Sequence, residues 1–361
     1  MRILFVGHRD PKHPAAGGAE EYVFQIAKRL AAKGYDVTIL AERPDGLPAT
    51  EVLDGVKIVR KGGFATLHLY APLYVSRHEY DVVVDNVAHV FPFASPLFTK
   101  ARTVAIIHHI NGPAIRKVMP LPLAPAGALA EKMHPKIYKI IVAPSRFTKE
   151  ELVKLGAREE AVHVVPPGVD HEIYRPGPKA EKPTIVWINR FVRYKNPDHA
   201  IKAFALVKKQ VPDAHMIMIG GGPLLQKTQQ LAQRLGLDIE FTGRVALEKK
   251  VEYLQRAWVC LYTSEIEGFG LVTLEAAASG TPCVGYAVGG LREGIKDGET
   301  GYLVSKGDIT RLANIVTRIL IDRQLLDKLS RNSIEYAKKY SWDTSAERFE
   351  SILSTQLASD P

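Results

Sequence analysis

The chain has 361 residues, of which 46% are hydrophobic, 24% charged and 8% aromatic. These proportions are typical of a folded globular protein and argue against a disordered, collagen-like or coiled-coil chain. The formal net charge of +9 favours anionic partners: nucleotides, nucleic acid or the acidic face of a membrane. Because one hydrophobic core rarely supports this length, we expect two domains.

The cysteines and the termini indicate a cytoplasmic protein. Cys260 and Cys283 stand alone in apolar runs, so neither a disulfide framework nor a zinc site is expected. The longest uncharged apolar run, at 119–130, contains three prolines and is too short to span a bilayer. The amino-terminal residues lack the apolar core and cleavage site of a signal peptide. We expect the protein in the cytoplasm, with a peripheral position on the inner face of the membrane as one option.

Short β-branched runs alternate with helical patterns along the whole chain, which indicates parallel sheets built from β-α-β units. A helix is predicted over 20–32, because its apolar residues fall on one face and Gly34 can end it. In the first half, strands are predicted at 2–7, 36–41, 56–60, 81–86, 103–109, 139–143 and 162–165.

A stretch at 175–183 is too rich in proline and polar residues for a helix or a central strand, so we place the domain boundary there. The predicted fold class is α/β, with domains at 1–176 and 183–343. Ligands of such sheets bind outside the carboxyl ends of the strands, in a cleft between two domains of this kind. In the second half we predict strands at 184–188, 215–219 and near 239, 259 and 282, and helices at 197–209 and 224–235.

Two features of the first half are candidate site residues. Gly17 and Gly18 precede the first helix, where free N–H groups and the helix dipole suit a phosphate, although such a pair can equally make only a turn. His108 ends the strand at 103–109 and is placed to point outward, although a structural histidine is the commoner case. Neither a Gly-x-Gly-x-x-Gly fingerprint nor a Gly-Lys-Ser/Thr phosphate loop is present.

The second half holds the sharper signals. Arg190 and Lys195 follow its first strand and can clamp a diphosphate, although a solvated basic loop has the same spacing. Glu267 precedes a predicted helix and Glu275 lies inside it, so the two carboxylates are too far apart to share a proton. The N–H groups of Phe269, Gly270 and Leu271 lie at that helix start.

A triple glycine at 220–222 lies between a strand and a helix, where backbone can approach a planar base. Leu225 occupies the third-glycine position of a dinucleotide fingerprint, which argues against a Rossmann dehydrogenase.

Taken together, these motifs resemble the retaining, nucleotide-sugar-dependent glycosyltransferases of family 4, which have the GT-B fold of two Rossmann-like doubly wound domains facing a cleft. The resemblance covers nearly the whole chain. In the first half it rests on 17–20, His108, 144–145 and 166–170. In the second half it rests on Arg190, Lys195, the glycines at 220–222, the Phe-Thr-Gly-Arg run at 241–244, the Glu-x7-Glu motif of Glu267 and Glu275, and Gly289, Gly290 and Glu293.

The resemblance implies a role for each residue. Arg190 and Lys195 neutralise the diphosphate, with Gly17, Gly18, Phe269, Gly270 and Leu271 adding backbone donors. Gly221 approaches the base. Glu267 binds the hexose hydroxyls, Glu275 the ribose, and His108 the transferred sugar. No Asp-x-Asp pair is present, so neither a metal nor another cofactor is expected, and catalysis is mainly charge stabilisation and positioning.

Asn189 and Pro167 depart from the family pattern, which usually has glycine and asparagine there, but neither removes a charged contact. A helix at about 344–361 is implied to return to the first domain. The sequence indicates the acceptor less clearly than the donor. The basic and apolar residues at 115–130 suit either a lipid-facing surface or a loop packed on the protein. Two alternatives stay open, a nucleotide-sugar epimerase of the same fold and a non-catalytic polyanion-binding protein, and no nucleic-acid motif supports the second.

Overall fold

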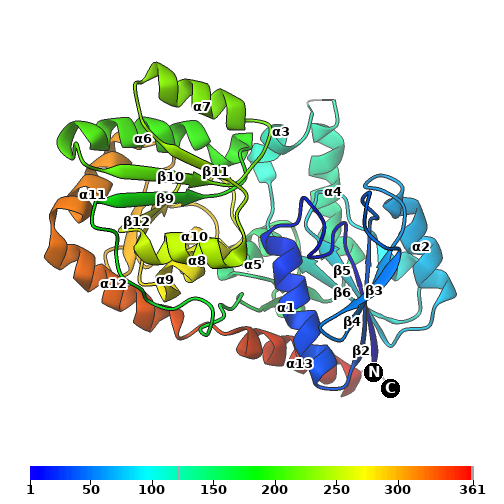
Figure 1. Ribbon diagram of the computed structural model, residues 1–361. Coiled ribbons are helices and arrows are strands. Elements are labelled where there is room, and N and C mark those ends of the chain that lie inside the picture. Colours follow the sequence, from blue (N-terminus) through cyan, green and yellow to red (C-terminus); the bar gives the residue numbers. More distant parts are fainter. Residues whose placement is uncertain (121, 359–361) are drawn as a thin grey trace. The chain divides into compact units, whose positions relative to one another are not determined.

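The computed structural model describes residues 1–120 and 122–358, with side chains up to residue 354. It divides into two compact units, residues 1–167 together with the segment from Trp342 onward (unit 1), and residues 168–341 (unit 2). Each unit contains one largely parallel sheet with helices packed on it (Figure 1). The predicted α/β class is therefore confirmed.

The sheet of unit 1 has the order β3-β4-β2-β1-β5-β6-β7-β8. The order reverses between β1 and β5, and in such sheets ligands bind outside the carboxyl ends of the two strands at this switch point. Only β3 runs antiparallel to its neighbour β4. The strands are β1 (Arg2–Val6), β2 (Asp36–Ala41), β3 (Thr50–Leu53), β4 (Val56–Arg60), β5 (Val82–Val87), β6 (Arg102–Ile107), β7 (Ile141–Ala143) and β8 (Val162–Val164).

Helix α13 (Trp342–Ala358) belongs to unit 1 and packs on α1 (Gly18–Ala32) (Figure 1). Asp343 pairs with Arg29 at 2.5 Å, and Glu350 pairs with Lys33 at 2.5 Å. Phe349 is fully buried, with its ring centroid 5.9 Å from that of Phe5. The chain therefore returns to its first unit after completing the second.

Residues 115–130, which the sequence left as a lipid-facing surface or a packed loop, are largely helical. They form α3 (Ile115–Val118) and the first part of α4 (Ala124–Ile137). Pro125 is tolerated because it lies in the first turn, where the N–H group needs no helical partner. The other helices of unit 1 are α2 (Leu67–Arg77) and α5 (Arg146–Lys154).

The sheet of unit 2 is entirely parallel, with the order β11-β10-β9-β12-β13-β14, and it reverses between β9 and β12. Alternate residues of β9 enter different cores: Trp187 packs on one face and Val186 on the other. Both faces are covered, which is why these strands appear as continuous apolar runs. The strands are β9 (Thr184–Ile188), β10 (His215–Ile219), β11 (Glu240–Gly243), β12 (Val259–Tyr262), β13 (Cys283–Tyr286) and β14 (Gly301–Val304).

Helices cover this sheet, and both cysteines are buried free thiols on the adjacent strands β12 and β13. The helices are α6 (Pro197–Gln210), α7 (Leu225–Arg234), α8 (Leu247–Arg256), α9 (Leu271–Ala278), α10 (Leu291–Gly294), α11 (Ile309–Ile321) and α12 (Arg323–Ala337).

The division between the units falls after Pro167, not within the proline-rich stretch at 175–183, so residues 168–176 belong to unit 2. Side chains of unit 2 hold this segment: Gln255 donates to the carbonyl of Arg175 at 2.9 Å, and Trp258 donates to that of Ala180 at 2.8 Å. A proline-rich segment lacks its own secondary structure, but these contacts make it part of a packed unit.

Candidate active site

Lys195 and Glu267 meet at the switch point of unit 2. Lys195 follows β9 and Glu267 follows β12, the two strands between which the sheet order reverses. The Lys195 ammonium contacts the Glu267 carboxylate, and the two side chains are only 10% and 11% exposed. Lys195 also lies 5.2 Å from the ring centroid of Tyr194 and 5.9 Å from that of Tyr262. The two oppositely charged groups are thus held together where a ligand of this fold binds.

Side chain to backbone bonds tie the loops of these two strands together. Thr263 donates to the carbonyl of Lys195 at 2.8 Å and accepts from the Trp187 indole at 2.9 Å. Asn196, in the left-handed region at φ 45°, donates to the carbonyl of Thr263 at 3.0 Å and begins α6. Because these groups are buried, the Lys195 backbone is fixed before any ligand arrives.

The loop that carries Glu267 is shaped by a close backbone approach. Gly290 donates to the carbonyl of Glu267 at 2.9 Å, and a Cβ atom on Gly290 would come within 1.9 Å of the Gly268 oxygen. Gly270 is the N-cap residue of α9, and Leu271 is the first residue of this helix. The ring of Phe269 is buried. The predicted backbone donors therefore lie at the start of α9, as the sequence indicated.

Glu275 is held by two residues that the sequence did not reveal. The Tyr174 hydroxyl donates to one carboxylate oxygen at 2.9 Å, and the Lys250 ammonium lies 2.5 Å from the other. Lys250 also donates to the Tyr174 hydroxyl at 3.2 Å. Tyr174 and Lys250 lie far from Glu275 in the sequence, and no local pattern pairs them with it.

Arg190 and Gly221 lie beside the Lys195 loop. Arg190 is exposed, and its guanidinium donates to the hydroxyl of Tyr194. A Cβ atom on Gly220 would come within 2.0 Å of the Asn189 oxygen, so this position needs glycine, whereas Gly221 faces open space. The structure therefore gathers Arg190, Lys195 and Glu267 around the switch point of unit 2, with Gly221 next to them.

In unit 1, His108 follows β6 and is buried. Its Nε2 atom lies 2.6 Å from the Asn86 side-chain oxygen, and its ring meets that of Tyr22 edge-on at 5.4 Å. Burial, with smaller contributions from the neighbouring His109 and His89, lowers the pKa of His108 to about 3. His108 is therefore neutral throughout the physiological range.

Gly17 and Gly18 are both exposed at the start of α1. The Gly17 N–H group donates to the Glu20 carboxylate at 2.7 Å, so it already has an acceptor. Glu20 thereby caps its own helix, as acidic residues commonly do at this position. Gly18 is the first residue of α1, where backbone N–H groups lack helical partners.

Because His108 is neutral in the folded protein, we expect the free energy of unfolding to fall in acid. Because its folded-state pKa lies below the unfolded value of 6.5, the unfolded chain takes up this proton first as the pH falls. We expect His108 alone to lower the free energy of unfolding by about 1.4 kcal/mol per pH unit between about pH 6 and pH 3. Urea unfolding of unit 1 at several pH values measures this slope. His108→Gln should flatten it, His78→Gln at an exposed site of unit 1 should not, and equal slopes in all three proteins would contradict the assignment.

Comparisons with known proteins identify the family. The profile described as "Glycosyl transferases group 1" matches residues 170–340, and "Glycosyltransferase Family 4" matches residues 16–173. The D-inositol 3-phosphate glycosyltransferase of Kribbella flavida is 30% identical over 379 residues, covering 92% of this chain and 89% of the relative. The chain belongs to glycosyltransferase family 4.

This family 4 glycosyltransferase is also similar to more distant proteins. A GDP-mannose-dependent alpha-(1-6)-phosphatidylinositol monomannoside mannosyltransferase of Mycobacterium tuberculosis is 24% identical, covering 98% of both chains. Among solved structures, HepE of Anabaena in complex with UDP-glucose matches with a TM-score of 0.79 at 20% identity, covering 98% of this chain and 100% of that one. The predicted GT-B fold is confirmed.

Two features are absent from the part of this glycosyltransferase that the structure describes. No helix within residues 1–120 and 122–358 is long and apolar enough to cross a membrane. Over the same residues, no group of three or more His, Cys, Asp or Glu side chains is arranged to hold a metal ion.

Proposed function

We propose that this glycosyltransferase moves a hexose from a nucleoside diphosphate sugar, such as UDP- or GDP-hexose, to a hydroxyl acceptor with retention of the anomeric configuration. The observation that carries the proposal is the pair of Lys195 and Glu267 at the switch point of unit 2. A diphosphate needs the cation and the sugar hydroxyls need the carboxylate, so one extended donor engages both.

In this proposal the enzyme acts through charge and position, without a metal. Lys195 and Arg190 stabilise the diphosphate as it leaves, Glu267 orients the hexose, and Glu275 binds the ribose. The bond from the anomeric carbon to the diphosphate breaks while the acceptor oxygen bonds to the same face. The acceptor proton passes to the departing phosphate oxygen, so no protein base is required. His108, being neutral, serves as a hydrogen-bonding group for the transferred sugar.

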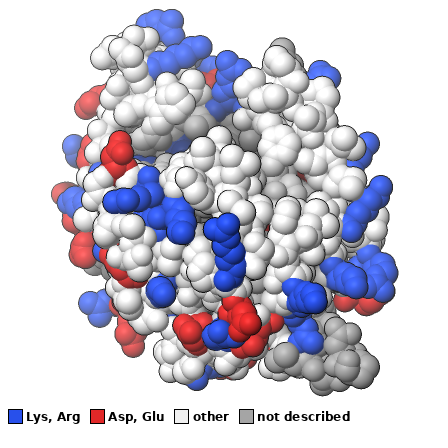
Figure 2. All heavy atoms as spheres, turned by 90° about the vertical axis from the view of Figure 1, so that its right-hand side faces the viewer, with Lys and Arg blue, Asp and Glu red and all other residues white. Residues whose placement is uncertain are grey.

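The proposed location is the cytoplasm, peripheral to the membrane, with a lipid-linked acceptor or another hydroxyl compound. The name of the mycobacterial relative includes a phosphatidylinositol acceptor, which supports this. Unit 1 exposes large apolar side chains on α2 and α4. Figure 2 shows uncharged areas interrupted by Lys and Arg side chains, with Asp and Glu side chains on the same face. The exposed apolar residues on these helices are Leu69, Tyr70, Leu73, Leu129 and Met133. Such a surface suits an anionic bilayer.

A donor assay in the presence of EDTA tests the proposal. The purified chain is incubated with UDP-glucose or GDP-mannose and a mixture of hydroxyl acceptors, and nucleotide release and product are followed by NMR. We expect release of UDP or GDP and a glycoside with the anomeric configuration of the donor. Conversion of the sugar without an acceptor would favour the epimerase. Salt-sensitive polyanion binding without any nucleotide release would favour the binding protein.

Loss of the Glu275 carboxylate is expected to weaken donor binding. Glu275→Gln should raise the KM for the donor about 10- to 100-fold, because a hydrogen bond to a charged group contributes about 1.5 to 3 kcal/mol. Tyr174→Phe should raise it by no more than about tenfold, since the carboxylate keeps Lys250. The control is Tyr253→Phe, which removes a hydroxyl that donates to Glu240. Steady-state kinetics measures these changes, and an unchanged KM in Glu275→Gln would contradict the role.

A further inference from the structure

A cluster of five aromatic rings lies at the switch point of unit 1. His8 follows β1 and is in contact with residues that follow β4 and β5. Its ring stacks on Phe64 at 4.3 Å and meets His89 edge-on at 4.7 Å, with Phe93 at 5.0 Å and His68 at 5.0 Å. We call these residues the His8 cluster.

His8 is buried but its polar atoms are not satisfied. Only 2% of the residue is exposed, and neither ring nitrogen has a hydrogen-bond partner within the described chain. Burial, with smaller contributions from His89, His68 and Arg9, lowers the pKa of His8 to about 2. A buried imidazole whose two nitrogens make no hydrogen bond lowers the stability of the fold unless a ligand bonds them. A neutral imidazole offers one donor and one acceptor. Phe64 covers it and is itself 49% exposed.

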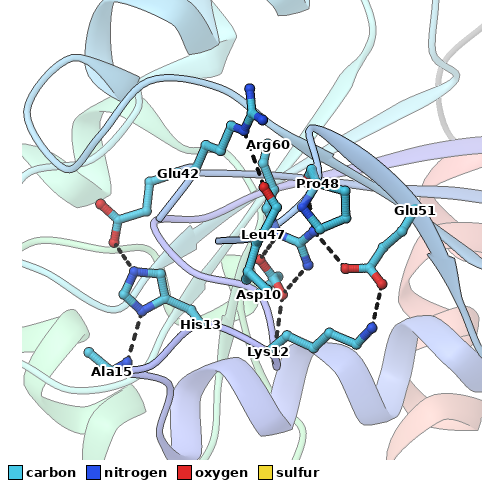
Figure 3. Close-up of polar contacts among 10 residues, drawn as sticks. Asp10, Lys12, His13, Ala15, Glu42, Leu47, Pro48, Glu51 and Arg60 are labelled. Atoms are coloured by element: carbon cyan, nitrogen blue, oxygen red, sulfur yellow. Dashed lines mark hydrogen bonds and ion pairs between the residues drawn. The ribbon is translucent and has the colours of Figure 1, made fainter. Parts of the chain in front are cut away.

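Lys12 of the neighbouring β1–α1 loop and Arg60 at the end of β4 are already paired (Figure 3). Arg60 is fully buried and makes two bonds to Asp10, at 2.6 and 2.8 Å. Lys12 pairs with Glu51, which also contacts Arg60. The carboxylates of Asp10 and Glu51 thus neutralise the cations that would otherwise be available to bind a phosphate.

Glu42 makes further contacts with the β1–α1 loop. The Glu42 carboxylate lies 3.2 Å from His13 (Figure 3). It also lies 3.5 Å from Arg9. Beyond the loop, Arg43 donates to the carbonyl of Leu47, and Lys61 lies over the Tyr74 ring at 5.4 Å. The cations at the strand ends around His8 therefore already contact carboxylate, carbonyl or aromatic partners.

We infer that the His8 cluster binds the acceptor of the proposed transfer as an uncharged polyhydroxylated ring, a sugar or a cyclitol without a ring phosphate. This rests on the proposed function and adds the chemical class of the acceptor. The exposed ring of Phe64 packs on the apolar C–H face of the acceptor, and His8 bonds a ring hydroxyl once the Phe64 side chain that covers it turns aside. A ring phosphate finds no free cation in the His8 cluster. Arg146, which is exposed and begins α5 after β7, is a cation at the same edge of the sheet but outside the His8 cluster.

Matched acceptors test this inference. The chain, with UDP-glucose or GDP-mannose as donor, is given myo-inositol or inositol 3-phosphate, and methyl mannoside or mannose 6-phosphate. We expect kcat/KM at least tenfold higher for the unphosphorylated member of a pair. Phe64→Ala should lower that value about tenfold. Phe98→Ala, which removes a phenylalanine ring of similar exposure outside the cluster, should leave it unchanged. A preference for the phosphorylated member would overturn the inference. Loss of that preference in Arg146→Ala would assign the phosphate contact to Arg146.

A second measurement covers the case in which no probe is glycosylated. Nucleotide release from the donor alone then tests the proposed function separately, and histidine-labelled NMR tests the acceptor site. Titration with myo-inositol or methyl mannoside should shift the His8 resonances, and the phosphorylated probes should shift them less. Larger shifts with the phosphorylated probes, or no shift with any probe, would overturn the inference.

Discussion

Replacing Lys195 by alanine is expected to lower kcat/KM for the donor about 100- to 1,000-fold. The ammonium is held 10% exposed at the switch point, where the surrounding groups exclude most water and strengthen its field. Removing one fixed group that stabilises developing charge costs about this factor in other enzymes. The variant also leaves Glu267 without its cation, so the carboxylate would repel the diphosphate. Initial rates with UDP-glucose and GDP-mannose measure the effect.

Two further variants separate chemistry from folding in the Lys195 experiment. Lys202→Ala removes a lysine from an exposed pair with Asp198 on α6 and should leave kcat/KM unchanged. The double variant Lys195→Ala with Glu267→Gln should lose less than the sum of the two single losses, because the residues act as a unit. Full activity in Lys195→Ala with a genuine acceptor would remove the basis of the proposed mechanism.

The strands of unit 2 were predictable because both faces of the sheet are covered, which makes β9 and β10 uninterrupted apolar runs. The antiparallel strand β3 was missed, since Thr50–Leu53 is short and half-exposed and has no apolar alternation. Helix α4 was missed because its prolines indicate a loop, although Pro125 sits where a helix accepts it. The unit boundary was displaced because packing by Gln255 and Trp258 decides it, and composition does not.

The site was predictable where a motif is local. Arg190, Lys195 and Glu267 each follow a predicted strand, and the rule for parallel sheets brings strand ends to one edge. Partners distant in sequence were not predictable: Tyr174 lies 101 positions from Glu275, and Asn86 lies 22 positions from His108. His8 shows the same limit, because its ring contacts depend on how three loops pack.

Breaking the buried pair of Arg60 and Asp10 is expected to cost more stability than any other change considered. Both side chains are fully buried, so Arg60→Met would leave the Asp10 carboxylate without its cation and lower the free energy of unfolding by about 3 to 5 kcal/mol. Urea unfolding followed by hydrogen exchange in β1 and α1 reports on unit 1 alone.

Changing both members of the pair should restore most of this loss. In Arg60→Met with Asp10→Leu no uncompensated charge remains, and apolar side chains of similar volume often replace a buried pair without cost. The matched control is Arg158→Met, which breaks an exposed pair with Glu160 in the same unit and should change stability by less than about 0.5 kcal/mol. If Arg60→Met were as stable as Arg158→Met, the network that holds the β1–α1 loop would contribute nothing to the fold. That loop leads directly into Gly17 and Gly18, to which the family resemblance assigns contacts with the diphosphate. We therefore expect Arg60→Met also to raise the KM for the donor.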